Sequence, residues 1–260
     1  MPDHRDTVAV IAGGTQGLGL AIAESLIAAG CTRIAIAGRR VAEGEAAAEG
    51  LRASGADAMF IPADMGLVGD AIALIDRAAD RFGHVNALVN AAATTERGSI
   101  LDCSPADFDR HLAVNTRGPF FALQRFAQRA VAGGHAASAV NILSMVVHCG
   151  QSYLAPYSAS KAALANVTRN AAQALRGHRI RVNGINCGWM DTPGEDAVQR
   201  RFHGAQDGWL EAAEAGQPMG TLVKPGHVAG LACYMLSADS GVMTGALVDF
   251  DQNVAGAYPE

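Results

Sequence analysis

The sequence lacks a long hydrophobic run and any recognisable targeting segment. No uninterrupted apolar stretch reaches the roughly 18 residues that a membrane helix requires. The opening segment MPDHRDT has no apolar core of the kind found in signal peptides. These two absences argue against a membrane protein and against a secreted one. We therefore expect a cytoplasmic protein that has no membrane partner.

Paired cysteines and clustered metal ligands are also missing. The 5 cysteines are an odd number, lie far apart and form no CxxC pair. Neither a disulfide framework nor a structural zinc site is therefore indicated. The 8 histidines show no spacing typical of metal ligands. We expect reduced thiols and no bound metal.

Charged residues are scarce, and their balance is slightly negative. They make up 17% of the chain, hydrophobic residues make up 50%, and the net charge is -5 at pH 7. The apolar fraction excludes a disordered chain. The negative balance excludes a nucleic-acid-binding protein that depends on bulk positive charge, so no nucleic-acid partner is expected.

What the sequence does contain is an alternation of short apolar runs and longer segments with helical spacing. The 260 residues exceed the roughly 150 of a typical domain, but no linker or repeat divides them, so we expect one domain over 1–260. The apolar runs lack polar alternation, which is typical of parallel strands covered by helices on both faces. Seven such runs are present: TVAVIA, RIAIAG, AMFIPAD, NALVN, AVNILS, RIRVNGIN and ALVDF. They predict an α/β, doubly wound fold of Rossmann type with a mostly parallel seven-stranded sheet.

The first strand-like run continues directly into the glycine-rich segment AGGTQGLGLAIA. Gly13, Gly17 and Gly19 fall at this strand–turn–helix junction with the spacing GxxxGxG. Glycines there let the backbone approach a pyrophosphate, and the positive end of the following helix favours the phosphate charge. A tight turn with close helix packing is the competing interpretation. The flanking strand and helix favour a dinucleotide site.

The end of the second strand bears on which dinucleotide would bind. An acidic side chain at this position hydrogen-bonds the adenosine ribose of NAD, but the strand here ends IAGRR. Gly38 takes the acidic position and Arg39 follows it, so a guanidinium is placed to pair with a 2'-phosphate. We therefore predict that NADP(H) is favoured, with NAD(H) possible. Solvated arginines at a helix start are the alternative interpretation of Arg39 and Arg40.

A tyrosine and a lysine four residues apart indicate acid–base chemistry. The segment from Pro156 onward is predicted to be helical, so Tyr157 and Lys161 project from one face. Moving the pKa of a tyrosine from about 10 to near 7 requires about 4 kcal/mol, much of which a close ammonium can supply. Ser144 ends a predicted strand thirteen residues before Tyr157. Catalytic groups gather at the carboxyl ends of parallel strands, so these three side chains are expected to meet there.

These motifs resemble those of the short-chain dehydrogenase/reductase family, and the resemblance spans about Thr7 to Asp251. AGGTQGLG is similar to the family's TGxxxGxG turn, NAAA at 90–93 to its NNAG, and NTRGPF at 115–120 to its Asn-containing helix segment. Ser144, Tyr157 and Lys161 match its catalytic set. The resemblance implies an NAD(P)(H)-dependent oxidoreductase that interconverts a secondary alcohol and a ketone by hydride transfer.

The resemblance also implies roles for individual residues. Tyr157 is expected to be the general acid/base, and Lys161 to lower its pKa and bind the nicotinamide ribose. Ser144 would orient the substrate oxygen, Asn115 would hold a water linking Lys161 to solvent, and Asp64 would bind the adenine edge. The other residues expected to bind the cofactor are Gly13, Thr15, Gln16, Gly17, Leu18, Gly19, Arg39, Arg40, Met65, Asn90, Ala91, Ala92, Gly188 and Thr192.

The chain departs from the family pattern at several places. Ala12, Ala91, Ala93 and Cys187 stand where the family usually has Thr, Asn, Gly and Pro, respectively. Near the C-terminus VDFDQN replaces the common VDGG, which leaves less room for a tight turn around Asp251. The four catalytic positions are intact.

An irregular stretch at about 191–224, which contains prolines, glycines and Trp209, is predicted to form a lid over the substrate. The residues expected near the substrate pocket are Thr94, Thr95, Glu96, His148, Gln151, Tyr153, Trp189, Met190 and Trp209. They mix polar groups with large aromatic rings. A small polyhydroxylated or cyclic alcohol or ketone is the expected substrate.

Two other functions remain open at this point. One is a reductase of 3-oxoacyl chains on an acyl-carrier protein, for which Arg125 and Arg129 are candidate docking residues. The other is a non-catalytic nucleotide-sensing protein, although such proteins usually lack part of the catalytic set. The resemblance further implies a homotetramer or homodimer in which helices at about 105–130 and 156–177 pack against their symmetry mates.

Overall fold

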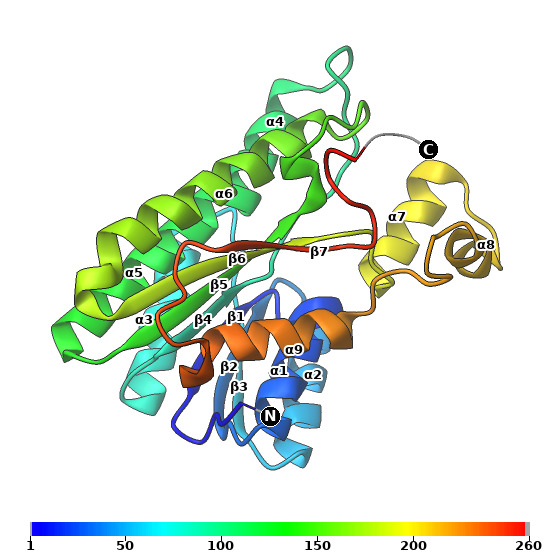
Figure 1. The fold of residues 1–260 in the computed structure, drawn as a ribbon. Coiled ribbons are helices and arrows are strands. Elements are labelled where there is room, and N and C mark those ends of the chain that lie inside the picture. The colour runs from blue at the N-terminus through cyan, green and yellow to red at the C-terminus, as the bar shows by residue number, and fades with distance from the viewer. Residues whose placement is uncertain (1, 258–260) are drawn as a thin grey trace.

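The computed structural model describes residues 2–257. Its central feature is a seven-stranded sheet (Figure 1). Every neighbouring pair of its strands is parallel, and their order is β3-β2-β1-β4-β5-β6-β7. The strands are β1 (Val8–Ala12), β2 (Arg33–Gly38), β3 (Asp57–Pro62), β4 (Ala87–Asn90), β5 (Ala137–Ser144), β6 (Ile180–Cys187) and β7 (Leu247–Phe250). The predicted doubly wound fold and all seven expected strands are therefore confirmed.

Helices cover both faces of the sheet, as the apolar strands require. In β1, Val8 and Val10 pack on one face while Ala9 and Ile11 pack on the other, and all four are fully buried. The helices α1 (Gly17–Ala28), α2 (Val41–Ala53) and α9 (Pro225–Leu236) cover the Ile11 face. The helices α3 (Val68–Phe82), α5 (Gly118–Gly133) and α6 (Ala155–Leu175) cover the opposite face.

The strand order places a crevice above the centre of the sheet. From β1 the chain winds first toward β2 and β3, and later crosses to β4 on the other side of β1. The loops after β1 and β4 therefore leave the sheet in opposite directions. In open α/β sheets, ligands bind outside the carboxyl ends of the strands at this switch point.

The helix expected at 105–130 is interrupted. It consists of α4 (Pro105–Leu112), a π-helical turn over Ala113–Arg117, and α5. Pro119 has no N–H to donate to the Asn115 carbonyl, which breaks the regular ladder at this point. A side chain at Gly118 would also collide with the Met65 carbonyl, so the turn is packed tightly against the loop after β3.

The segment at 191–224 is more ordered than its sequence predicted. It contains α7 (Pro193–His203) and α8 (Trp209–Ala215), which lie beside the carboxyl edge of the sheet (Figure 1). The Thr192 hydroxyl accepts a hydrogen bond from the Glu195 N–H and so caps α7, with Pro193 in the first turn. Among the described residues, no helix is long and apolar enough to cross a membrane.

Candidate active site

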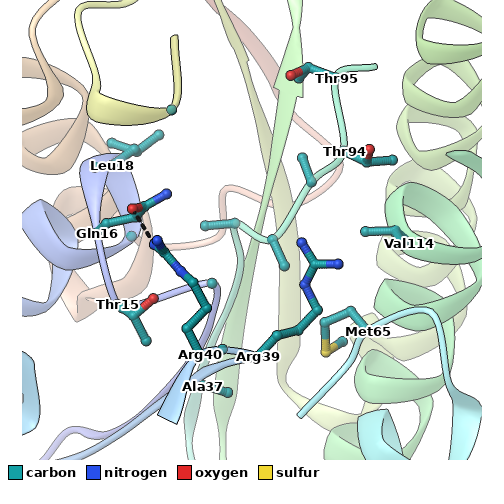
Figure 2. Close-up of a pocket in the computed structure, with 18 of the residues that line it drawn as sticks. Thr15, Gln16, Leu18, Ala37, Arg39, Arg40, Met65, Thr94, Thr95 and Val114 are labelled. Carbon is teal, nitrogen blue, oxygen red and sulfur yellow. Dashed lines mark hydrogen bonds between the residues drawn. The ribbon is translucent and has the colours of Figure 1, made fainter. Parts of the chain in front are cut away.

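A long cleft opens at the carboxyl ends of β1, β2 and β4. Figure 2 shows Thr15 and Gln16 on one side of it, Met65 and Val114 on the other, and Arg39 between them. Most of the residues predicted to bind a cofactor line this cleft: Gly13, Thr15, Gln16, Gly17, Leu18, Gly19, Arg39, Arg40, Asp64, Met65, Ala91, Ala92 and Thr192. The glycine turn and the 90–93 motif, which are far apart in the sequence, therefore form one surface.

The glycines of the turn are required by backbone packing. Gly13 has a φ of 81°, and a Cβ there would lie 2.5 Å from the Ala92 nitrogen. A Cβ on Gly19 would collide with the Gly13 carbonyl, and Gly17 also has a positive φ of 55°. Because no side chain fills the space above this turn, a pyrophosphate can reach the first N–H groups of α1. The residues present thus fit a dinucleotide.

The end of β2 discriminates against an acidic side chain. A Cβ on Gly38 would lie 2.8 Å from the Thr15 Cγ2 atom, so a carboxylate at this position needs Thr15 to move. The Arg40 guanidinium donates to the Gln16 side-chain oxygen at 2.6 Å and pairs with Glu43 at 3.2 Å. Arg39 is exposed and extends into the cleft (Figure 2). The cation Arg39 therefore directly follows Gly38, the position at which NAD-binding sites have an acid.

The predicted catalytic residues lie deeper, around the ends of β5 and β6. Ser144 is the last residue of β5 and pairs in register with Cys187 of β6. Tyr157 and Lys161 belong to the first turns of α6, and the Lys161 Nζ lies 5.8 Å from the centre of the Tyr157 ring. Lys161 is 2% exposed, and its ammonium donates to the Ile142 carbonyl at 2.7 Å. The serine, tyrosine and lysine thus meet, as the sequence predicted.

The ionisation of this group differs from the expectation. Burial raises the pKa of Tyr157 to about 12, while the neighbouring Ser144 hydroxyl acts in the opposite direction. Burial also lowers the pKa of Lys161 to about 8. Removing both groups from water disfavours both charges, and for Tyr157 this effect exceeds the opposing effect of the Ser144 hydrogen bond. In the free protein, the prediction of a tyrosine pKa near 7 is therefore not met.

Asn115 connects the catalytic helix to the loop after β4. Its side-chain oxygen accepts from the Thr94 N–H at 2.8 Å, and its amide donates to the Thr94 carbonyl and the Ser160 hydroxyl, each at 3.0 Å. Ser160 in turn donates to the Tyr157 carbonyl at 2.7 Å. The buried amide is thus occupied by protein groups, and it fixes the start of α6 relative to the cleft.

Three other predicted residues have individual outcomes. Asn90 is buried beneath the cleft rather than lining it, because its amide donates to Asn141 on β5 at 2.8 Å. The Asp64 carboxylate accepts from the Gly66 N–H at 2.8 Å while lining the cleft. Gly188 follows β6 outside the nucleotide cleft, and a Cβ there would collide with the Asp251 carboxylate. Asp251 therefore accounts for a glycine at position 188.

The structure adds residues that the sequence argument missed. Arg110 and Val114 come from α4 and the π-helical turn, and Gly194 and Glu195 come from the start of α7. The other additions are Ala37, Gly38, Ala63 and Ala93, and the cleft also includes Thr94 and Thr95, which were expected near the substrate pocket. Thr192 and Glu195 have the spacing of a helix capping box, so a helix at this position could have been recognised. The π-helical turn that places Val114 has no comparable local signal.

The segment predicted to form a lid is held together by tryptophans and carboxylates. The Trp189 indole donates to Glu195 at 2.8 Å, and the Trp209 indole donates to Asp196 at 2.7 Å. The two indole rings stack with their centres 6.4 Å apart. At the far end of the lid, Lys224 pairs with Asp191 at 2.8 Å and with Glu214 at 2.6 Å. These side-chain contacts hold α7 and α8 together, and Arg201 and His203 of α7 join them to Glu96 and Arg97 of the loop after β4.

Metal coordination is not a feature of the described residues. Within 2–257, no group of three or more His, Cys, Asp or Glu side chains is placed to hold a metal ion. The site instead consists of a glycine-lined cleft and, beside it, a partly buried phenol and hydroxyl with a buried ammonium. Such a site belongs to nucleotide-dependent oxidoreductases, in which the cofactor carries the hydride and the protein supplies orientation and a proton.

Comparisons with known proteins agree with this class. The family model described as Enoyl-(Acyl carrier protein) reductase matches residues 12–252. The chain is 32% identical to an NADP-dependent (R)-specific alcohol dehydrogenase of Lentilactobacillus kefiri, over 92% of each chain. It is 30% identical to a galactitol 2-dehydrogenase of Agrobacterium fabrum, over 90% of this chain and 91% of that protein.

A solved structure shows the same architecture. A short-chain type dehydrogenase/reductase from Mycobacterium marinum superposes with a TM-score of 0.87 at 25% identity, over 96% of this chain and 95% of that one. The chain belongs to the short-chain dehydrogenase/reductase family. It is an oxidoreductase that acts on CH–OH groups and their ketone counterparts.

Proposed function

We propose that this protein reduces a ketone to a secondary alcohol, and catalyses the reverse oxidation, with Tyr157 as the general acid/base. The observation that carries this proposal is the meeting of Tyr157, Lys161 and Ser144 at the carboxyl end of β5, the strand next to β4, whose following loop lines the cleft of the glycine turn. A dinucleotide bound in the cleft would supply or accept the hydride.

Tyr157, Ser144 and Lys161 each have a separate role in the transfer of the proton. Tyr157 gives its phenolic proton to the substrate oxygen during reduction and removes that proton during oxidation. Ser144 donates a hydrogen bond to the same oxygen and stabilises its developing charge. Lys161, held by the Ile142 carbonyl, lies beside the tyrosine ring and favours the phenolate during oxidation. Burial raises the pKa of Tyr157, so in the free protein the phenol carries the proton that reduction requires.

We propose NADP(H) as the favoured cofactor, with NAD(H) used less well. Arg39 extends into the cleft, and no carboxylate follows β2 to accept hydrogen bonds from a ribose. A guanidinium binds a phosphate through two parallel hydrogen bonds, so Arg39 would hold the 2'-phosphate. The NADP dependence in the name of the Lentilactobacillus kefiri relative supports this choice.

A small polyhydroxylated or cyclic alcohol or ketone remains the proposed substrate class. The names of the related alcohol and galactitol dehydrogenases support small hydroxylated molecules. The lid contributes Trp189 and Glu195, which offer an apolar ring and a hydrogen-bonding carboxylate. Such a mixture suits a molecule with both a carbon face and hydroxyl groups.

A reductase of carrier-bound acyl chains is the second candidate, because the matching family model bears that description. The docking residues expected for it are neutralised, however. Arg125 pairs with Asp76 at 2.8 Å, and Arg129 pairs with Asp80 at 2.9 Å. These pairs remove most of the positive field that an acidic carrier would need. The small-molecule function is therefore favoured.

We also propose a cytoplasmic homotetramer or homodimer that contacts its copies through α5 and α6. The groove between these helices is lined mainly by apolar residues, and Phe120 and Val131 are 42% and 43% exposed there. Exposed apolar patches of this kind mark protein interfaces. Analytical ultracentrifugation of the wild type and of Val131→Glu tests the proposal, and an unchanged sedimentation coefficient would contradict it.

The decisive test of the enzyme proposal is Tyr157→Phe. Removing the phenolic oxygen should lower kcat by roughly 10²–10⁴, the range for a general acid or base. NADPH affinity, measured by fluorescence titration, should change by less than about threefold.

Tyr234→Phe is the matched control, because Tyr234 lies on α9, on the opposite face of the sheet from α6. This variant should retain wild-type activity. Wild-type activity in Tyr157→Phe would overturn the assignment.

A further inference from the structure

An arginine at the mouth of the site is not used by the mechanism above. Arg97 belongs to the loop between β4 and α4, whose Gly98 N–H donates to the Tyr153 carbonyl just before α6 at 3.0 Å. The Arg97 guanidinium lies 5.3 Å from the centre of the Tyr153 ring and 5.9 Å from that of Phe202 on α7. Arg97 therefore lies where the β4 loop, the lid and the start of the catalytic helix meet.

An imidazole ring and a backbone carbonyl hold this guanidinium in place. Its Nε and Nη2 approach the His203 ring nitrogen at 3.1 and 2.9 Å, and Nη1 donates to the Thr95 carbonyl at 3.1 Å. Among the described residues, no carboxylate forms an ion pair with it. The adjacent Glu96 is paired with Arg201 at 3.0 Å. Arg97 thus keeps a full positive charge while being only partly exposed.

The Arg97 guanidinium packs on the ring of Tyr153, four residues before Tyr157. Its positive charge lowers the pKa of Tyr157, whereas the negative charge of Glu195 raises it, in agreement with this placement. Glu195 accepts hydrogen bonds from the Trp189 indole at 2.8 Å and the Gln199 amide at 2.7 Å. Arg97 and Glu195 thus carry opposite charges that both influence Tyr157, and among residues 2–257 neither forms an ion pair.

We propose that Arg97 determines specificity by binding a carboxylate of the substrate, so that the enzyme acts on a hydroxy acid or an oxo acid. This inference rests on the proposed function and narrows its substrate class. The contacts above use three of the five N–H groups of Arg97, and the remaining two, one on each Nη nitrogen, can offer a carboxylate two parallel hydrogen bonds. Glu195 repels an anion, so the carboxylate lies on the Arg97 side and neutral hydroxyls face the lid carboxylate.

A structural role for Arg97 predicts different behaviour. As a strut between Tyr153 and His203, it would hold α7 in place for every substrate, and its loss would impair charged and neutral substrates equally. As a carboxylate-binding residue, its loss impairs charged substrates alone. The ratio of kcat/KM between matched charged and neutral substrates separates the two roles.

The experiment uses alcohols that come in pairs, one member with a carboxylate and the other without it. Suitable pairs are D-gluconate with D-glucitol, 3-hydroxybutyrate with 2-butanol, and 3-hydroxycyclohexanecarboxylate with 3-methylcyclohexanol, each assayed with NADP⁺ and NAD⁺. The wild type should prefer the acid in at least one pair. In Arg97→Gln, kcat/KM for that acid should fall at least tenfold, and that for its neutral partner should stay within about threefold, because only the acid loses charged hydrogen bonds.

Two further variants complete the design. Arg97→Lys keeps the charge without the planar fork and should show an intermediate loss on the acid. Arg201→Gln removes a nearby arginine that Glu96 already neutralises, and it should leave the acid-to-neutral ratio unchanged.

Equal losses on both members of a pair in Arg97→Gln, or a wild type that prefers the neutral members, would overturn the carboxylate proposal. If the wild type turned over no member of any pair, the carboxylate proposal would also be overturned. If it failed on a wider ketone panel as well, the proposed function would be overturned too. Turnover of neutral alcohols that depends on Tyr157 would leave the proposed function intact. The two failures are thus distinguishable.

Discussion

The two walls of the cleft are built in different ways. The turn after β1 is shaped by backbone packing, because Cβ atoms on Gly13 or Gly19 would strike the main chain of neighbouring segments. The lid is shaped by side chains: α7 and α8 contain no buried residue, and indole–carboxylate hydrogen bonds hold them. Positions that are fixed by backbone packing tolerate few substitutions. Surface side-chain pairs each contribute only about 0–1 kcal/mol to stability, so they can be replaced at little cost. The turn therefore suits a constant cofactor, and the lid can be adapted to a particular substrate.

The largest expected effect comes from adding a methyl group to the rigid wall. Gly13→Ala combines a left-handed φ with a Cβ 2.5 Å from the Ala92 nitrogen. The free energy of unfolding should fall by about 1–3 kcal/mol, as for other strained backbone positions. NADPH affinity should fall at least tenfold, because the turn must shift away from the phosphates. Thermal denaturation and fluorescence titration measure the two quantities.

Gly50→Ala provides the control for this variant. Gly50 lies in α2, and a Cβ added there would have nothing within 4 Å, so alanine should stabilise the protein by about 0.5–1 kcal/mol. Equal stability of Gly13→Ala and Gly50→Ala would show that the turn is less rigid than its packing indicates.

An intermediate effect on catalysis is expected for Arg39, an exposed side chain directly after β2. Arg39→Ala should lower kcat/KM for NADPH roughly 10- to 100-fold, the range for losing hydrogen bonds to a charged group of about 1.5–3 kcal/mol. kcat/KM for NADH should stay within about threefold. Initial-rate kinetics with both cofactors measure the change.

Arg40→Ala is the matched neighbour, because Arg40 already binds Gln16 and Glu43. Its effect on NADPH should be several-fold smaller than that of Arg39→Ala. A larger loss in Arg40→Ala would assign the 2'-phosphate to Arg40 instead.

The smallest expected effect is an acid-induced loosening of the lid. Hydrogen bonds from Trp209 and Arg200 lower the pKa of Asp196 below its usual 3.8. A carboxyl group with a lowered pKa stabilises the fold above pH 3.8, and that contribution is lost as the pH falls through the folded-state value. The chain's 2 tryptophans, Trp189 and Trp209, both belong to the lid region. Their emission should therefore stay constant down to about pH 4 and change below it.

Asp196→Asn removes the ionisation and keeps an oxygen that accepts from the Trp209 indole. In this variant the emission change below pH 4 should be smaller than in the wild type. An identical acid transition in both proteins would show that another group controls the contact.

Local sequence signals predicted most of the sheet and the turn. The strands from TVAVIA to ALVDF are continuous apolar runs, and the glycines at 13, 17 and 19 mark the junction. These features depend on neighbours in the sequence, so periodicity and motif spacing reveal them. The helix α7 could also have been predicted, since Thr192, Pro193 and Glu195 form a recognisable helix start.

Features that depend on distant contacts could not be predicted from the sequence. The π-helical turn is braced by Asn115, which binds Thr94 and Ser160 at separations of 21 and 45 residues. The raised pKa of Tyr157 depends on burial, which no spacing reveals. Arg97 escaped notice because its role depends on His203, which lies 106 residues away.

The first turn of α7 belongs to both walls at once. Thr192, Gly194 and Glu195 line the nucleotide cleft, and the same Glu195 holds the Trp189 indole on the lid. A phosphate resting against Gly17 would also touch the neighbourhood of Thr192, since a Cβ on Gly17 would lie 3.5 Å from the Thr192 Cβ. A bound nucleotide would therefore contact the helix start that also supports the Trp189 indole, so a substitution in this turn should alter cofactor binding and substrate binding together.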